Sequence, residues 1–134
     1  MGFLLDTSTC IFFLRGKIQL DKIFRDIGLQ NCYISEITVA ELRFGAENSD
    51  DPRKSHKAVD LFLQGLTIIP IFGSIRKYAE EKVRLRKIGK PLHDEFDLFI
   101  GVTAIVNGLT LVTDNLKDFE RLENIKIENW FERK

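Results

Sequence analysis

The chain has 134 residues, about the size of one average domain. Hydrophobic residues make up 44% of it and charged residues 30%, and its 20 basic and 20 acidic residues cancel. This composition excludes an intrinsically disordered chain, and it excludes attraction of nucleic acid or membranes by overall charge. We expect one domain, residues 1–134, in which any charged partner binds a local patch.

The N-terminus and the two cysteines bear on location. The first apolar run has no basic residue before it and is interrupted by Asp6, so neither a signal peptide nor a membrane span is expected. Cys10 and Cys32 lack the spacing of a zinc site or a disulfide framework. The chain therefore fits a reducing cytoplasm.

Strands and helices alternate in the first half of the chain. Short apolar runs predict strands at 3–6 and 32–37, and helical spacing between them predicts helices at 8–14 and 20–27. A third helix is expected to open with Thr38 as its N-cap, because Glu41 stands three positions later as in a capping box. Asp51-Pro52 then starts a helix that reaches about Gln64.

The second half continues the alternation. A strand is expected at 66–71, where Pro70 favours an edge position or the end of a strand. A basic helix should follow at 74–88, with its buried side formed by Ile75, Tyr78, Ala79, Val83 and Leu85. The apolar segment 93–108 predicts a buried central helix, and the last two strands are expected at 109–115 and 125–130. This order predicts an α/β sandwich around a mainly parallel sheet, with ligands at the carboxyl ends of its strands.

Four acidic residues fall at that edge of the expected sheet. They are Asp6, Glu41, Asp97 and Asp114. Each alone could serve as a helix cap or complete a capping box. Together they would repel one another by roughly 1 to 4 kcal/mol per close pair, which a hard divalent cation relieves. Mg²⁺ and Mn²⁺ prefer such oxygen ligands, and phosphodiester hydrolysis is the chemistry that they serve.

Several short motifs carry a family resemblance over nearly the whole chain. They are LLDTS around Asp6, TVAELRFGA around Glu41, GKPL with FDLFIGVTA around Asp97, LVTDN around Asp114, and the closing IENW. In their order and spacing they resemble the PIN-domain proteins, specifically the VapC-type ribonuclease toxins of toxin–antitoxin pairs. The resemblance implies a PIN-like three-layer α/β/α sandwich with about five strands. It also implies a Mg²⁺- or Mn²⁺-dependent endoribonuclease, a homodimer, and inhibition by a small antitoxin.

The four carboxylates receive roles on this basis. We expect Asp6, Asp97 and Asp114 to ligate one or two metal ions directly, and Glu41 to bind a second ion or orient the attacking water. Asp94 is a rival or supplementary ligand to Asp97, although it more simply caps a helix. Further supporting residues are Ser8, which stands where many relatives have Asn, and Thr113 and Asn115 beside Asp114. Thr7 is interpreted as an ordinary residue at a strand end.

Two other features stay open at this stage. The basic residues of segment 76–90, and Arg43, form either a solvated surface or a track for RNA phosphates. The 11 phenylalanines are mostly core, and some could line a groove for a partner helix or a dimer face.

Two alternative functions are considered for the chain: a non-cleaving PIN-like scaffold that binds RNA or protein, and a receiver-like phosphoacceptor domain. The phosphoacceptor fits poorly, because Thr7 and Ser8 follow Asp6 where further acidic residues are needed.

Overall fold

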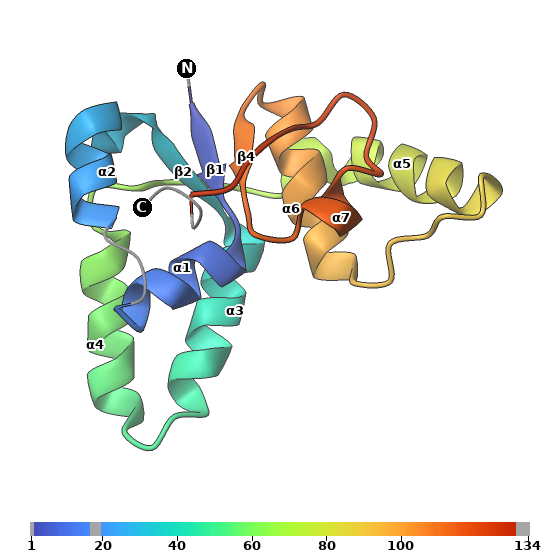
Figure 1. The fold of residues 1–134 in the computed structure, drawn as a ribbon. Coiled ribbons are helices and arrows are strands. Elements are labelled where there is room, and N and C mark those ends of the chain that lie inside the picture. Colours follow the sequence, from blue (N-terminus) through green and yellow to red (C-terminus); the bar gives the residue numbers. More distant parts are fainter. Residues whose placement is uncertain (1, 17–19, 131–134) are drawn as a thin grey trace.

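The computed structural model describes residues 2–16 and 20–130, so both ends of the expected domain 1–134 lie outside the described residues. Within this part, strands and helices alternate as predicted (Figure 1). The strands are β1 (Phe3–Leu5), β2 (Cys32–Ser35), β3 (Thr67–Ile69), β4 (Thr110–Val112) and β5 (Lys126–Glu128). The helices are α1 (Thr7–Leu14), α2 (Leu20–Ile27), α3 (Glu36–Glu47), α4 (Pro52–Leu63), α5 (Ile75–Lys87), α6 (Glu95–Val106) and α7 (Leu116–Phe119), with 3₁₀ turns η1 (Leu29–Asn31) and η2 (Phe72–Ser74).

The five strands form one sheet in the order β3-β2-β1-β4-β5, and each described pairing is parallel. The edge position predicted for the strand before Pro70 is confirmed, because β3 lies at the end of the sheet. The chain builds outward from β1 to β3 and then returns to the other side of β1 with β4. Such a reversal opens a crevice at the carboxyl ends of the two strands that flank it. Asp6 follows β1 and Asp114 follows β4, so both lie at this crevice.

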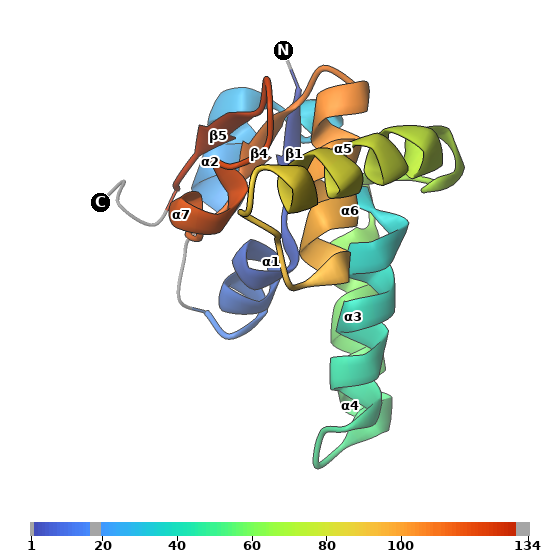
Figure 2. The ribbon, with the colours of Figure 1, turned by 90° about the vertical axis from the view of Figure 1, so that its right-hand side faces the viewer.

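Helices cover both faces of the sheet, which confirms the three-layer α/β/α architecture. Successive side chains of a strand point to opposite faces. Accordingly Phe3 and Leu5 of β1 pack into a core with α1 to α4, whereas Leu4 packs into a second core with α5, α6 and α7. Helices α3 and α4 form a hairpin that projects beyond the carboxyl end of the sheet, as both views show (Figures 1 and 2). In the described part of the chain, every helix is too short or too polar to cross a bilayer.

The predicted start of the third helix is wrong by three residues. The helix begins at Glu36 with Ser35 as its N-cap, and the Ser35 hydroxyl accepts a hydrogen bond from the Ile37 amide at 3.0 Å. The strand prediction 32–37 is too long for the same reason, because β2 ends at Ser35, opposite Ile69 of β3. Thr38 is therefore inside the helix, where its side chain is buried and free for another contact.

The buried side predicted for the basic helix is wrong in part. Leu85 of α5 is buried as expected, but Ile75, Ala79 and Val83 are exposed and Glu81 is buried instead. The Glu81 carboxylate accepts two hydrogen bonds from Arg84, at 2.7 and 2.8 Å, and one from the Glu123 amide at 3.1 Å. A buried charge that is paired and hydrogen-bonded in this way is tolerated in a protein interior. This long-range pairing decides which face of α5 turns inward.

Candidate functional site

Asp6 lies at the end of β1 and anchors the candidate site. Its side chain is 3% exposed and caps α1, because Oδ1 accepts the Thr9 amide at 2.9 Å. The Ser8 hydroxyl lies 3.0 Å from both of its oxygens. Burial raises the pKa of Asp6, while hydrogen bonds from Thr113, Thr9 and Ser8 act in the opposite direction. The cap and the candidate ligand are thus the same carboxylate, with several donors holding it in place.

Ser8 also connects Asp6 to Asp114. The Ser8 hydroxyl lies 3.0 Å from Oδ1 of Asp114, which is exposed at the end of β4. A hydroxyl has one proton, so Ser8 donates to only one of the two carboxylates at a time. The structure therefore brings Asp6, Ser8 and Asp114 together, as the sequence predicted.

Glu41 reaches the site from α3 through a residue that the sequence analysis interpreted as ordinary. The Thr7 hydroxyl donates to Oε1 of Glu41 at 2.6 Å, and its oxygen lies 3.1 Å from the Thr38 hydroxyl. Burial raises the pKa of Glu41, the Thr7 hydrogen bond opposes that change, and the charges of Asp94 and Asp6 add to it. Thr7 therefore orients Glu41, and the capping box predicted between Thr38 and Glu41 is replaced by this contact between helices.

Asp97 lies in the first turn of α6, with Asp94 as the N-cap of that helix. Oδ1 of Asp94 accepts the amides of Phe96 and Asp97 at 2.9 and 3.2 Å, so the capping interpretation of Asp94 is confirmed. Burial raises the pKa of Asp97 to about 7, and the carboxylates of Asp94, Asp6, Glu41 and Asp118 contribute further. Asp97 is thus the carboxyl on which the negative charges of the site converge.

Asp118 is a further carboxylate near the site, and the sequence analysis missed it. It lies in α7, and its Oδ2 accepts a hydrogen bond at 3.1 Å from the side-chain amide of Asn115. The Asn115 backbone amide in turn donates to the Thr113 hydroxyl at 3.0 Å. Asn115 and Thr113 therefore link Asp118 to Asp6 through hydrogen bonds. No local sequence signal marked Asp118, because its neighbours are those of an ordinary surface helix.

The donor set fits a hard divalent cation. It consists of carboxylate oxygens, and burial first and neighbouring carboxylates second raise the pKa of Asp97 and Glu41. Across the described ranges, no three His, Cys, Asp or Glu side chains lie close enough together to enclose one ion. Mg²⁺ tolerates such a site, because it is held by one or two carboxylates and completes its octahedron with waters and substrate phosphate.

A largely apolar groove leads away from Glu41. It has a volume of about 320 Å³ and lies between α1, α3 and α4. Ile11, Leu42 and Val59 supply apolar lining, and Arg15 lies on its wall. The groove and the acidic site share Glu41, so a molecule that fills the groove reaches the carboxylates.

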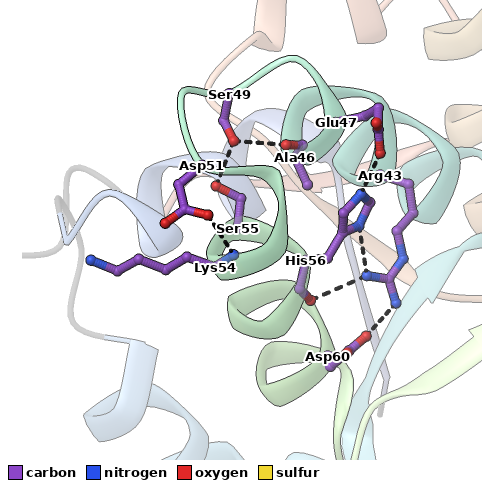
Figure 3. Close-up of polar contacts among 9 residues, drawn as sticks. All are labelled: Arg43, Ala46, Glu47, Ser49, Asp51, Lys54, Ser55, His56 and Asp60. Carbon is purple, nitrogen blue, oxygen red and sulfur yellow. Dashed lines mark hydrogen bonds and ion pairs between the residues drawn. The ribbon is translucent and has the colours of Figure 1, made fainter.

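A polar clasp holds the two helices of the groove together (Figure 3). Arg43 of α3 donates to the backbone carbonyl of His56 at 3.2 Å and to Asp60 at 2.5 Å, both on α4. The His56 ring lies between Arg43 and Glu47, with Nδ1 3.2 Å from Nη1 of Arg43 and Nε2 2.9 Å from Oε1 of Glu47. Arg43 therefore supports the hairpin, and the structure gives it this role in place of the phosphate contact considered from sequence.

The basic residues of α5 are also partly neutralised. Arg84 pairs with buried Glu81, Arg76 lies 3.4 Å from Glu80, and Lys82 pairs with Glu95. Arg76 and Lys82 fit the solvated-surface interpretation, whereas Arg84 is held against the buried Glu81 carboxylate.

Comparison with known proteins identifies the family of this chain. The family model of the PIN domain matches residues 3–125. The chain is 33% identical over 131 residues to the tRNA(fMet)-specific endonuclease VapC of Salmonella typhimurium, covering 97% of this chain and 98% of that protein. It is 35% identical over 138 residues to ribonuclease VapC2 of Haemophilus influenzae strain Rd, with the same coverage.

Solved structures give the same result. The DNA-bound VapBC complex of Salmonella typhimurium contains a chain that superposes with a TM-score of 0.90 at 32% identity, covering 97% of this chain and 98% of that one. The VapBC2 complex of Rickettsia felis, bound to a fragment of promoter DNA, gives a TM-score of 0.87 at 30% identity, covering 97% and 99%. The chain therefore belongs to the PIN-domain family and, within it, to the VapC ribonucleases.

Proposed function

We propose that this chain is the Mg²⁺- or Mn²⁺-dependent endoribonuclease toxin of a toxin–antitoxin pair. The observation that carries the proposal is Asp97, a partly buried carboxyl whose pKa is raised by burial and by four neighbouring carboxylates. Such a concentration of negative charge favours a divalent cation. The names of the VapC relatives supply the reaction class, and the carboxylates supply a site for it.

The side chains divide the work. Asp6, Asp97 and Asp114 would hold one or two ions, with Asp118 beside them, and a bound ion supplies Lewis acidity toward the phosphodiester and the attacking water. Ser8 and Thr113 fix the orientation of Asp6 through hydrogen bonds. Glu41 either binds a second ion or orients the attacking water: Thr7 occupies its Oε1, and Oε2 is left to accept a proton from water.

The direct test is cleavage of RNA by the isolated chain with Mg²⁺ or Mn²⁺. Initiator tRNA is the first substrate to try, because the Salmonella relative is named for tRNA(fMet). EDTA and Asp97→Asn should each abolish the products, and Asp50→Asn, a change in the exposed loop after α3, should leave them intact. A folded chain that binds Mn²⁺ but cleaves no RNA would instead support a non-cleaving scaffold.

The groove beside Glu41 is the proposed docking site for an antitoxin. Structures of VapBC complexes among its neighbours indicate a partner of this kind. An amphipathic segment would place apolar side chains against Leu42 and Val59, with its end at Glu41, and so block the carboxylates. Gly45 borders the groove, and a Cβ added there meets open space. Gly45→Leu should therefore weaken inhibition by a candidate antitoxin while cleavage persists.

We also propose a homodimer through exposed apolar side chains beside the site. Phe44 is 73% exposed and Phe72 84%, and the Ile71 amide before η2 donates to Glu36 of α3 at 2.9 Å. Large apolar side chains exposed to this degree are candidates for a protein interface. Light scattering should give twice the chain mass, and Phe72→Ser should reduce it to one chain.

A further inference from the structure

Two segments far apart in the sequence carry the second half of the acidic site, and one arginine contacts both. Asp97 lies in the first turn of α6, after the loop that begins near Pro91, whereas Asp118 lies in α7. Nη1 of Arg121 donates to the Pro91 carbonyl at 2.8 Å, and Nη2 lies 3.6 Å from Oδ1 of Asp118. A guanidinium presents its donors as a rigid fork, so Arg121 fixes one segment relative to the other.

The backbone of Arg121 is itself anchored from α5. Nη2 of Arg84 donates to the Arg121 carbonyl at 2.8 Å, and Arg84 is paired with the buried carboxylate of Glu81. Glu81 also accepts the Glu123 amide. The turn that carries Arg121 is therefore held on both sides by a chain of hydrogen bonds that ends in the protein interior.

Close packing between α6 and the segment around Arg121 fixes the position of the Arg121 backbone. A Cβ added to Gly101 of α6 would lie 2.3 Å from Leu122 and 3.2 Å from Phe119, which are both buried. The segment from α7 to Leu122 thus packs directly against α6, and this packing fixes the backbone that carries Arg121. The exposed fraction of its side chain is 29%, so it is partly shielded from water.

We propose that Arg121 is a positioning residue that holds the loop before Asp94 and the carboxylate of Asp118 in the arrangement that binds the divalent cation. The inference rests on the proposed metal-dependent function. Arg121 touches neither the reacting atoms nor Asp97 in this arrangement; it acts through Asp118 and the Pro91 loop.

The sign of the effect separates this role from a charge effect. Removing a positive charge beside carboxylates makes the site more negative, so electrostatics alone predict tighter binding of a cation after Arg121→Gln. Loss of positioning predicts the opposite. Removing a partner that orients ligands weakens metal affinity by about 10-fold to 100-fold. Weaker Mn²⁺ binding therefore points to geometry.

The experiment measures Mn²⁺ affinity by calorimetry and amide hydrogen exchange without metal, for the wild-type chain and three variants. Arg121→Gln should lower the Mn²⁺ affinity about tenfold. It should also speed exchange of the Phe96 and Asp97 amides, which Asp94 caps. Arg121→Lys keeps the charge without the fork and should restore part of both properties. Arg86→Gln, on exposed α5 surface, is the matched control and should change neither.

The outcomes are separable. Equal or tighter Mn²⁺ binding by Arg121→Gln, or unchanged exchange at Phe96 and Asp97, overturns the role of Arg121 alone. Failure of the wild-type chain to bind Mn²⁺ overturns the proposed function as well. If circular dichroism shows that Arg121→Gln does not fold, Arg121→Lys decides the question. A Mn²⁺ affinity below that of the wild type supports the role of Arg121, and an unchanged affinity refutes it.

Discussion

Replacing Asp97 by Asn should stabilise the protein when no divalent cation is present. The pKa of this carboxyl rises from 3.8 to about 7 on folding, first because of burial and then because of neighbouring carboxylates. Between these two pH values the folded chain holds a proton that the unfolded chain releases, so stability falls as pH rises. This loss of stability is complete above pH 7. An Asn side chain is neutral at every pH, so the variant does not lose stability in this way.

The size of the effect follows from the pKa change. Its ceiling is about 4 kcal/mol, and because Asp97 is only partly buried and water screens its neighbours, we expect about 1 to 2 kcal/mol at pH 8. For a chain of this length each kcal/mol corresponds to a change in melting temperature of about 4 °C. The gain should be clearly smaller at pH 5, where less of the penalty has developed.

Thermal melting by circular dichroism in EDTA, at pH 5 and pH 8, tests this reasoning. Asp50→Asn, in an exposed loop, is the control and should melt with the wild type at both pH values. Added Mn²⁺ should raise the melting temperature of the wild type and have less effect on Asp97→Asn. A variant that melts lower than the wild type at pH 8, or whose gain is equal at both pH values, would refute the convergence of negative charge on Asp97.

Three further predictions follow from the contacts. Glu81→Gln should lower the free energy of unfolding by about 2 kcal/mol in urea denaturation at pH 7, because it breaks the ion pair with Arg84. The cost should be smaller near pH 4, because pairing lowers the pKa of Glu81 and its contribution is lost as pH falls; an equal cost at both pH values would contradict this. Thr7→Val removes the hydrogen bond that lowers the pKa of Glu41, so the acid limb of the cleavage profile should move to higher pH, whereas exposed Thr67→Val should leave the profile in place. Ser8→Ala should reduce cleavage about tenfold with little change in melting temperature, and full activity would show that the bridge between Asp6 and Asp114 is dispensable.

The sequence predicted the fold well where one signal dominates. The apolar run of α6 could only be a buried helix, and Asp6 and Asp114 each end an apolar run, which put both at the same sheet edge. The buried face of α5 was mispredicted because its apolar residues fit more than one side of the helix. The deciding contact, from Glu81 to the Glu123 amide, joins residues 42 positions apart.

The site was predicted in its main residues and missed in its details for similar reasons. A capping box at Thr38 and Glu41 satisfies the local pattern, but β2 ends earlier and Ser35 caps the helix first. Asp118 has the sequence neighbours of an ordinary surface helix. In the folded chain its charge contributes to the raised pKa of Asp97, and this coupling depends on tertiary structure.

The pairing of β1 with β4 has a consequence for synthesis of the chain. Asp6 is synthesised well before Asp114, the residue to which Ser8 links it, because Asp114 lies 106 positions after Ser8. A nascent chain or a fragment that ends before α6 contains Asp6 and Glu41 and lacks the other half of the acidic edge. The carboxylates can therefore meet only after β4 has been synthesised, so the acidic edge cannot form from the first half of the domain alone.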